Sequence, residues 1–115
     1  PGHLGHIVGC AGTEAFIKAL ASETGPINIR VLGVRSHAIV DAVAAGSYTG
    51  EIFTVKAQSM GLTVEQWLGG AAQGTMLGRL PTLAQIAEVT TFLATDHAGA
   101  MTATVVNITG GATVS

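Results

Sequence analysis

Two short runs rich in β-branched residues, 27–34 and 103–108, each follow a segment whose apolar residues recur at helical spacing. The first helical segment covers about residues 11–24, and Gly25-Pro26 predicts its end, because glycine accepts a left-handed turn and proline cannot continue a helix. The second helical segment covers about residues 82–95. Parallel neighbours in a sheet need helical crossovers, so this alternation predicts an α/β fold with a parallel sheet.

The connection over residues 35–78 is too long for an ordinary link and has helical patterns of its own, at about 52–58 and 63–72. In the second pattern, one face carries Val64, Trp67, Leu68 and Ala71. Trp67 therefore fits an amphipathic helix that packs on the core, and lining an apolar substrate pocket is the alternative. We predict one domain over residues 1–115, in which 35–78 form a helical insertion of the kind that serves as a lid or substrate loop.

Local signals mark the limits of two further elements. Thr82 and Gln85 have the spacing of a capping box, in which each side chain satisfies a backbone amide of the other residue at a helix start. Gly110 and Gly111 follow the second strand and predict a tight turn that returns the chain.

The composition predicts a surface that meets another surface. Apolar residues make up 48% of the 115 residues and charged residues only 10%. A chain of this size buries about two thirds of its unfolded surface when it folds alone. A sheet of two strands also leaves both outer edges unpaired. We expect a homo-oligomer, a dimer or tetramer, or a missing N-terminal half that covers these surfaces.

Charge and hydropathy argue against several classes of partner. The net charge is −2, and five scattered Lys and Arg residues form no basic stripe, which argues against nucleic-acid binding. No apolar run reaches the roughly 20 residues that a transmembrane helix needs, and the first residues do not resemble a signal peptide. The single cysteine, Cys10, cannot form an internal disulfide. We predict a cytoplasmic protein with no membrane partner.

Several segments together resemble the short-chain dehydrogenase/reductase family over nearly all of residues 9–115. They are AFIKALASETGP at 15–26, IRV at 29–31, GRLPTLAQIA at 78–87, FLATD at 92–96 and VVNITGG at 105–111. The resemblance implies the C-terminal half of a doubly wound Rossmann-type parallel sheet. It also implies an oxidoreductase that uses NAD or NADP on a small-molecule substrate, and subunit interfaces at the first helix and at the last helix and strand.

The resemblance breaks at the residues that carry the family's chemistry. In this register His6 stands at the position of the catalytic tyrosine and Cys10 at that of the lysine four residues later. Imidazole can move a proton, but a neutral thiol cannot supply the lysine's positive charge. The only tyrosine, Tyr48, is followed four positions later by Ile52, and no glycine-rich phosphate turn follows a strand. We therefore predict a truncated oxidoreductase-like protein that is inactive alone, and whether it is itself an enzyme stays open.

The loop after the first strand is the predicted ligand site, because open α/β sheets bind ligands at the carboxyl ends of their strands. Family members read Pro-Gly-x-Ile-x-Thr there, where this chain has SHAIVD at 36–41. The resemblance implies cofactor contacts at Ser36, His37, Ile39 and Asp41. It places Tyr48 and Trp67 in the substrate loop.

Two further interpretations belong to other classes of protein. The chain is alternatively a non-catalytic oligomerisation or ligand-binding module. A weaker alternative is a metal-binding protein, because His3, His6 and Cys10 are chemically suitable zinc ligands, to which His37 or His97 would add a fourth. We predict no metal site, since histidine-rich ends are commonly solvated.

Overall fold

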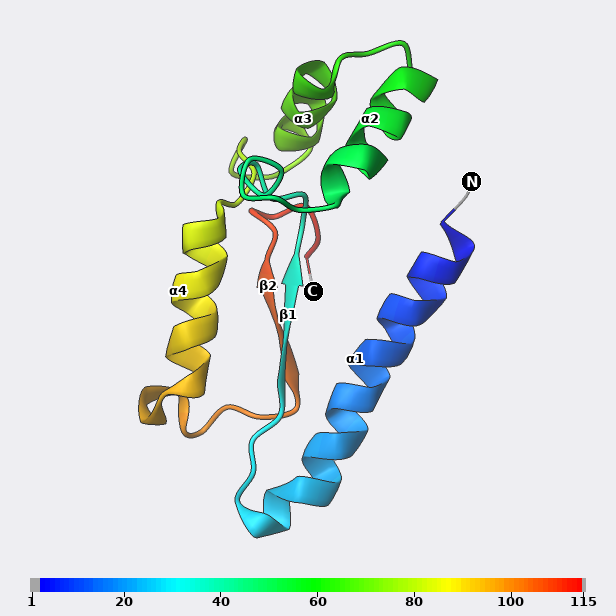
Figure 1. The fold of residues 1–115 in the computed structure, drawn as a ribbon. Coiled ribbons are helices and arrows are strands. Elements are labelled where there is room, and N and C mark those ends of the chain that lie inside the picture. Colours follow the sequence, from blue (N-terminus) through cyan, green and yellow to red (C-terminus); the bar gives the residue numbers. More distant parts are fainter. Residues whose placement is uncertain (1–2, 115) are drawn as a thin grey trace. The chain divides into compact units, whose positions relative to one another are not determined.

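The computed structural model describes residues 3–114. In chain order, the elements are α1 (Leu4–Thr24), a 3-10 turn (Gly25–Ile27), β1 (Leu32–Ser36), α2 (Thr49–Ser59), α3 (Val64–Gln73), α4 (Leu83–Ala94), a second 3-10 turn (Asp96–Ala98) and β2 (Thr104–Ile108) (Figure 1). Contacts divide the chain into two compact units. Unit 1 contains the residues up to Arg35 together with Thr90–Val106, and unit 2 contains Ser36–Val89 together with the residues from Asn107 onward.

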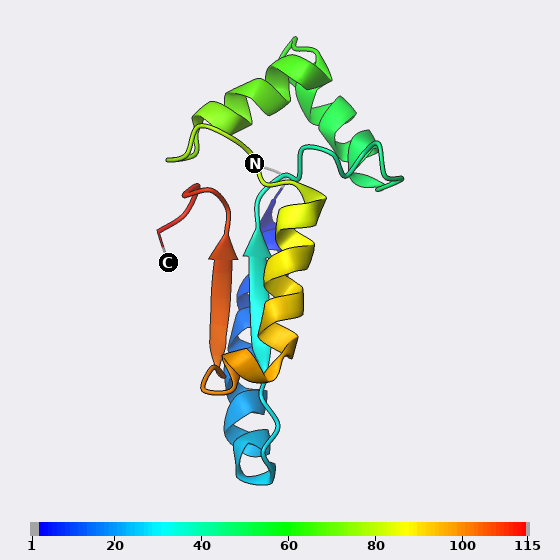
Figure 2. The same ribbon diagram turned by 90° about the vertical axis from the view of Figure 1, so that its left-hand side faces the viewer.

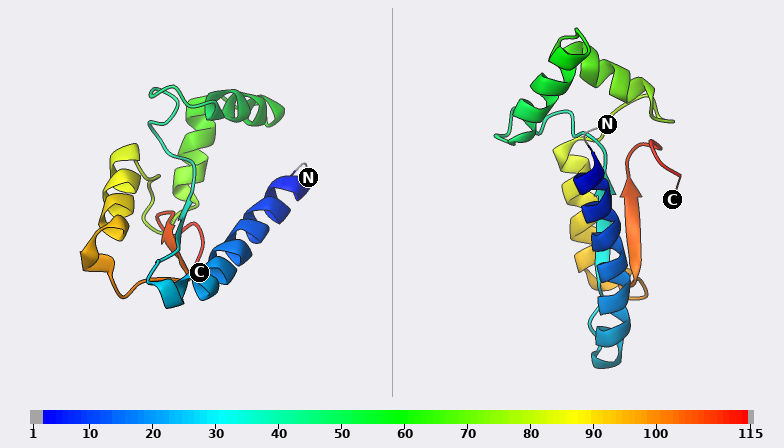
Figure 3. Two further views of the ribbon diagram at one scale, coloured as in Figure 1. Left: turned by 60° about the horizontal axis from the view of Figure 1, so that its bottom comes forward. Right: turned by 90° about the vertical axis from the view of Figure 1, so that its right-hand side faces the viewer.

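Strands β1 and β2 are neighbours in a two-stranded sheet and run in the same direction (Figure 1). This confirms the predicted α/β class with a parallel sheet. Helix α1 and the C-terminal end of α4 lie on opposite faces of the strands (Figure 2, Figure 3). None of the described helices combines the length and apolar character that crossing a lipid bilayer requires.

Close packing of α1 on the strands in unit 1 depends on Gly33. A Cβ atom at this position would lie 2.6 Å from Cδ1 of Ile17 on α1 and 3.2 Å from Cγ2 of Val105 on β2. Elsewhere in unit 1, the Arg30 guanidinium donates to the carbonyl oxygens of Thr95 and Met101, at 3.2 and 3.4 Å. Gly33 thus allows α1, β1 and β2 to approach closely, and the half-buried Arg30 connects the segment before β1 to the residues after α4.

Helix α1 begins at Leu4, so the predicted start near residue 11 was wrong. Its first turns carry Leu4, Ile7 and Val8, which are exposed by 80%, 62% and 61%. These three residues share one helix face, but the glycines and histidines around them make the helical pattern weak in the sequence. Glycine lowers helix propensity by only about 1 kcal/mol, so Gly5 and Gly9 do not prevent the helix.

Strand β1 covers Leu32–Ser36 rather than the predicted residues 27–34. The preceding segment forms the turn Gly25–Ile27, and Asn28 adopts a left-handed conformation with φ of 62°. Only Val31 extends the pairing before β1, since its carbonyl oxygen accepts from the Ala103 amide at 2.9 Å. The predicted strand 103–108 corresponds to β2 and the predicted helix 82–95 to α4, and each prediction was right to within one residue at either end.

Unit 2 contains the predicted helical insertion as α2 and α3, which contact each other. Phe53 and Ala57 of α2 are buried. On α3, the predicted face of Val64, Trp67, Leu68 and Ala71 is half-buried, and the residues between them on the other face are exposed. The helical period therefore predicted the packing face of α3 correctly.

Candidate functional site

The loop that follows β1 is held to the segment before α4 within unit 2. The Val40 amide donates to the carbonyl oxygen of Pro81 at 3.1 Å. Asp41 Oδ1 accepts a hydrogen bond from the Leu83 amide at 2.8 Å. Of the four residues predicted to contact a cofactor, Ser36 is the last residue of β1, and this anchored loop carries the other three, His37, Ile39 and Asp41.

The Asp41 carboxylate caps helix α4. Leu83 is the first residue of α4, and its amide has no acceptor inside the helix. A carboxylate at this end also interacts favourably with the positive end of the helix dipole. Beside it, the Thr82 amide donates to Gln85 Oε1 at 3.0 Å and the Gln85 amide to Thr82 Oγ1 at 3.2 Å, which confirms the predicted capping box. A cofactor contact of Asp41 remains a prediction.

Substitution Asp41→Ala should lower the free energy of unfolding by about 1 kcal/mol, because it removes a helix cap and a favourable charge. Chemical denaturation followed by circular dichroism measures this difference. The control is Glu88→Ala, which removes the same charge from the exposed middle of α4 and should change stability by less than about 0.5 kcal/mol. Equal effects of the two substitutions would show that only the charge matters.

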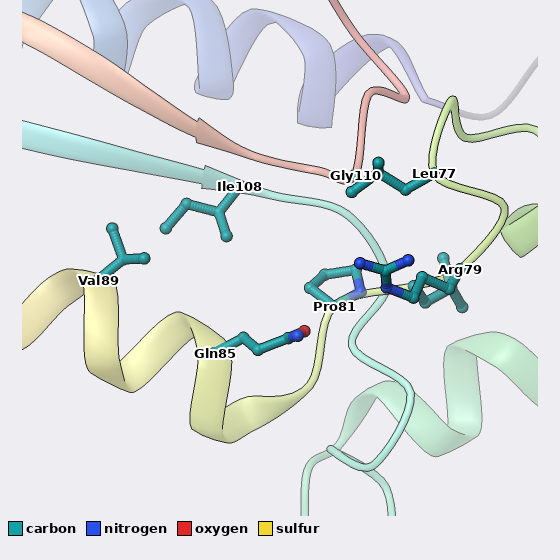
Figure 4. A pocket seen from close by; sticks show the side chains of 8 residues that line it. Leu77, Arg79, Pro81, Gln85, Val89, Ile108 and Gly110 are labelled. Atoms are coloured by element: carbon teal, nitrogen blue, oxygen red, sulfur yellow. The ribbon is translucent and has the colours of Figure 1, made fainter.

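A hollow of about 230 Å³ lies beside the start of α4 in unit 2. Figure 4 shows the side chains around it: apolar groups from α4, β2 and the segment before α4, together with the polar ends of Arg79 and Gln85. It is lined by Leu77, Arg79, Leu80, Pro81, Gln85, Val89, Ile108 and Gly110.

A second hollow, of about 450 Å³, lies along α3 in the same unit. Its lining residues are Val40, Glu65, Leu68, Gly69, Ala72, Gly78, Arg79 and Leu80. The walls are mostly apolar, and Glu65 and Arg79 bring one charge of each sign. Its size falls in the range of small-molecule sites, about 300–1,000 Å³. Arg79 and Leu80 belong to both hollows, so we call the two together the Arg79 site.

Arg79 is positioned by a threonine that sequence reasoning missed. Thr75 is buried, its hydroxyl donates to the Ala72 carbonyl oxygen at 2.7 Å, and it accepts from the Arg79 amide at 3.1 Å. The Leu77 amide donates to the carbonyl oxygen of Gly110 at 2.9 Å. Threonine in a connection often bonds to nearby backbone in this way, which is the local signal that was available.

The two residues predicted for the substrate loop lie within the insertion 35–78 but outside the Arg79 site, and a substrate contact of either remains a prediction. Tyr48 precedes α2 and is 89% exposed. The Trp67 ring lies 4.9 Å from the Phe53 ring, centroid to centroid, and joins α3 to α2. The residues that line the Arg79 site do not include Tyr48 or Trp67.

His6 and Cys10, predicted for the catalytic positions, lie together on α1. Cys10 Sγ is 3.6 Å from His6 Nε2, and both residues are exposed. They belong to unit 1, whereas Asp41 and the Arg79 site belong to unit 2. Over residues 3–114, no three or more His, Cys, Asp or Glu side chains are grouped to hold a metal ion. The metal-binding alternative needs His3, His6, Cys10 and a fourth ligand at one place, and the described residues do not form such a group.

Comparison with known proteins gives one family match. A family model described as enoyl-(acyl carrier protein) reductase matches residues 8–113. No curated protein sequence matches the chain.

Solved structures of similar fold include three dehydrogenases. A short chain dehydrogenase family protein from Francisella tularensis subsp. tularensis SCHU S4 has 22% identity and a TM-score of 0.76, over 89% of this chain and 40% of that one. Sorbitol-6-phosphate 2-dehydrogenase SrlD from Erwinia amylovora has 21% identity and a TM-score of 0.76, over 90% and 39%. A C-terminal deletion mutant of aldohexose dehydrogenase (AldT) from Thermoplasma acidophilum has 16% identity and a TM-score of 0.79, over 96% and 46%. The chain therefore spans less than half the length of each of these proteins.

Proposed function

This chain belongs to the short-chain dehydrogenase/reductase family, and from that premise we propose that it forms the substrate-binding half of an NAD(P)-dependent oxidoreductase domain. The observation that carries the proposal is the Arg79 site, built from α3, the loop after β1 and the start of α4. Ligands of open α/β sheets bind beyond the carboxyl ends of the strands, where this loop begins.

The Arg79 site suits a small substrate with an apolar body and a polar or anionic end. Leu68, Leu80 and Val40 offer apolar walls, and the Arg79 guanidinium offers hydrogen-bond donors and a positive charge. The hydrogen bonds to Thr75 and Gly110 fix the backbone around Arg79, so the Arg79 side chain extends from an ordered backbone position. In this proposal the chain binds and orients the substrate.

The residues present do not fit a complete dinucleotide site. A pyrophosphate is usually held by a glycine-rich turn between a strand and a helix, and no such turn follows β1 or β2. Ser36, His37, Ile39 and Asp41 are proposed to contact the nicotinamide end of NAD or NADP only. The pyrophosphate contacts must come from outside these 115 residues.

Proton transfer by this chain also differs from the family pattern. His6 and Cys10 replace the tyrosine and lysine, so an imidazole is the available proton carrier and no lysine cation assists it. We therefore propose that the chain alone is inactive as a reductase or dehydrogenase.

The partner that completes the domain is proposed to cover α1. The exposed apolar residues of α1 include Leu4, Ile7, Val8 and Phe16, and Phe16 is 62% exposed. Either the other half of the domain or a second copy of this chain buries these side chains. The second copy corresponds to the alternative function, a non-catalytic oligomerisation or ligand-binding module, which the same apolar face favours.

The test is a measurement of native mass by light scattering, repeated with NADH and NADPH while nucleotide fluorescence is followed. We expect a dimer or tetramer of the chain and no change in the fluorescence of either nucleotide. The physical reasons are the exposed face of α1 and the lack of a pyrophosphate cradle.

A monomer that binds either nucleotide would contradict the proposal and would place a complete cofactor site in these residues. An assembly that binds nucleotide would contradict only the claim that the pyrophosphate contacts lie elsewhere.

A further inference from the structure

One hollow of the Arg79 site, of about 450 Å³, lies along one face of α3. The residues of α3 that line it are Glu65, Leu68, Gly69 and Ala72. Their spacing at three and four positions places them on one side of the helix. The helix advances by about 1.5 Å per residue, so this wall is about 10 Å long, from Glu65 to Ala72.

Arg79 lies at the Ala72 end of this wall. The buried Thr75 hydroxyl donates to the Ala72 carbonyl oxygen at 2.7 Å and accepts from the Arg79 amide at 3.1 Å. Because both groups bind the same hydroxyl, the Arg79 backbone lies next to the end of the wall that is about two helical turns from Glu65. The residue with the carboxylate and the residue with the guanidinium therefore border opposite ends of the hollow.

The two charges are not neutralised by each other or by a neighbour. Within residues 3–114, the side chains of Glu65 and Arg79 take part in no ion pair or side-chain hydrogen bond. Both residues are exposed, so their polar atoms are available to a ligand. Asp41, which follows the lining residue Val40, is engaged, because its Oδ1 accepts from the Leu83 amide at 2.8 Å.

We propose that this hollow binds a short aliphatic acid with a hydrogen-bond donor, a hydroxyl or an ammonium group, at its other end. The Arg79 guanidinium has only donors and pairs with a carboxylate, whereas the Glu65 carboxylate has only acceptors and requires a donor. Leu68 and Leu80 pack against the chain between the two ends. This inference rests on the proposed function, since it names the substrate class of the Arg79 site.

The experiment is a titration of the nitrogen-15-labelled chain followed by NMR. The probes are hexanoate, its ω-hydroxy and ω-amino derivatives, the dicarboxylate adipate, and hexanol. We expect the amide signals of α3 and of residues 78–80 to shift and saturate with an ω-substituted acid. That acid should bind about threefold to tenfold more tightly than hexanoate or hexanol, because both of its ends are paired. The tighter of the two derivatives identifies the donor group.

Two variants separate the roles of the charges. Arg79→Gln should weaken binding of the ω-substituted acid by about fivefold or more, because the carboxylate loses a charged partner. Glu65→Gln should instead strengthen binding of adipate, because it removes the repulsion between like charges. Lys18→Gln and Glu88→Gln are the matched controls, since they make the same charge changes at exposed helical positions that do not line the hollow, and they should leave both affinities unchanged.

The outcomes distinguish this inference from the proposed function. Equal affinity for hexanol and the ω-substituted acids, or unchanged affinity in Arg79→Gln, would overturn the inference and leave the hollow as a small-molecule site of apolar preference. Absence of a shift with every probe would overturn the inference and also the claim that the Arg79 site binds a substrate. Spectra of the variants without probe establish that each one keeps its fold.

Discussion

Replacing Phe53 with alanine should lower the free energy of unfolding by about 3–5 kcal/mol, the usual cost of removing a buried aromatic side chain. Phe53 is only 7% exposed, and its ring centroid lies 4.9 Å from that of Trp67. This ring pair joins α2 to α3, and α3 forms one wall of the Arg79 site. The substitution should therefore loosen the site as well as the helices.

Two measurements check this expectation. Denaturation followed by circular dichroism gives the change in unfolding free energy. Trp67 is the only tryptophan, so its emission should shift to the red in Phe53→Ala as water replaces the neighbouring ring. The control is Tyr48→Ala, which removes an exposed aromatic ring from the start of the same helix and should cost less than about 0.5 kcal/mol. Equal stability of the two variants would refute the packing described for Phe53.

Replacing Gly111 with alanine should lower the free energy of unfolding by about 2–4 kcal/mol, from backbone strain and overpacking together. Gly111 has φ of 85°, in the left-handed region that side chains disfavour. An added Cβ would lie 2.6 Å from Cβ of Met76, an atom that cannot move away without its backbone. The clash would push the glycine turn away from the segment that holds Arg79.

The matched control for this turn is Gly12→Ala. Gly12 lies within α1, and a Cβ atom added there would have no neighbouring atom within 4 Å, so alanine should stabilise the helix by up to about 1 kcal/mol. Thermal unfolding of both variants should give shifts of opposite sign. A rise in the unfolding temperature of Gly111→Ala would show that this turn does not need a left-handed glycine.

Much of the fold could be predicted because its signals are local. The capping box of Thr82 and Gln85 and the packing face of α3 depend on residues three or four positions apart, which lie together in any helix. The same is true of His6 and Cys10, whose proximity follows from their spacing. The early part of α1 was missed because glycine and histidine surround Leu4, Ile7 and Val8, so the helical pattern in the sequence is weak there.

The sequence by itself determined the α/β class, the order of the helices and strands, and the family resemblance. Only the tertiary structure decided that Asp41 caps a helix 42 residues away, that Thr75 and Gly110 hold the segment around Arg79, and that Arg79 lines both hollows. The physical reason is the range of the interactions. Helix periods and caps are settled between near neighbours, whereas a hydrogen bond between distant segments exists only once the chain has folded back to bring them together.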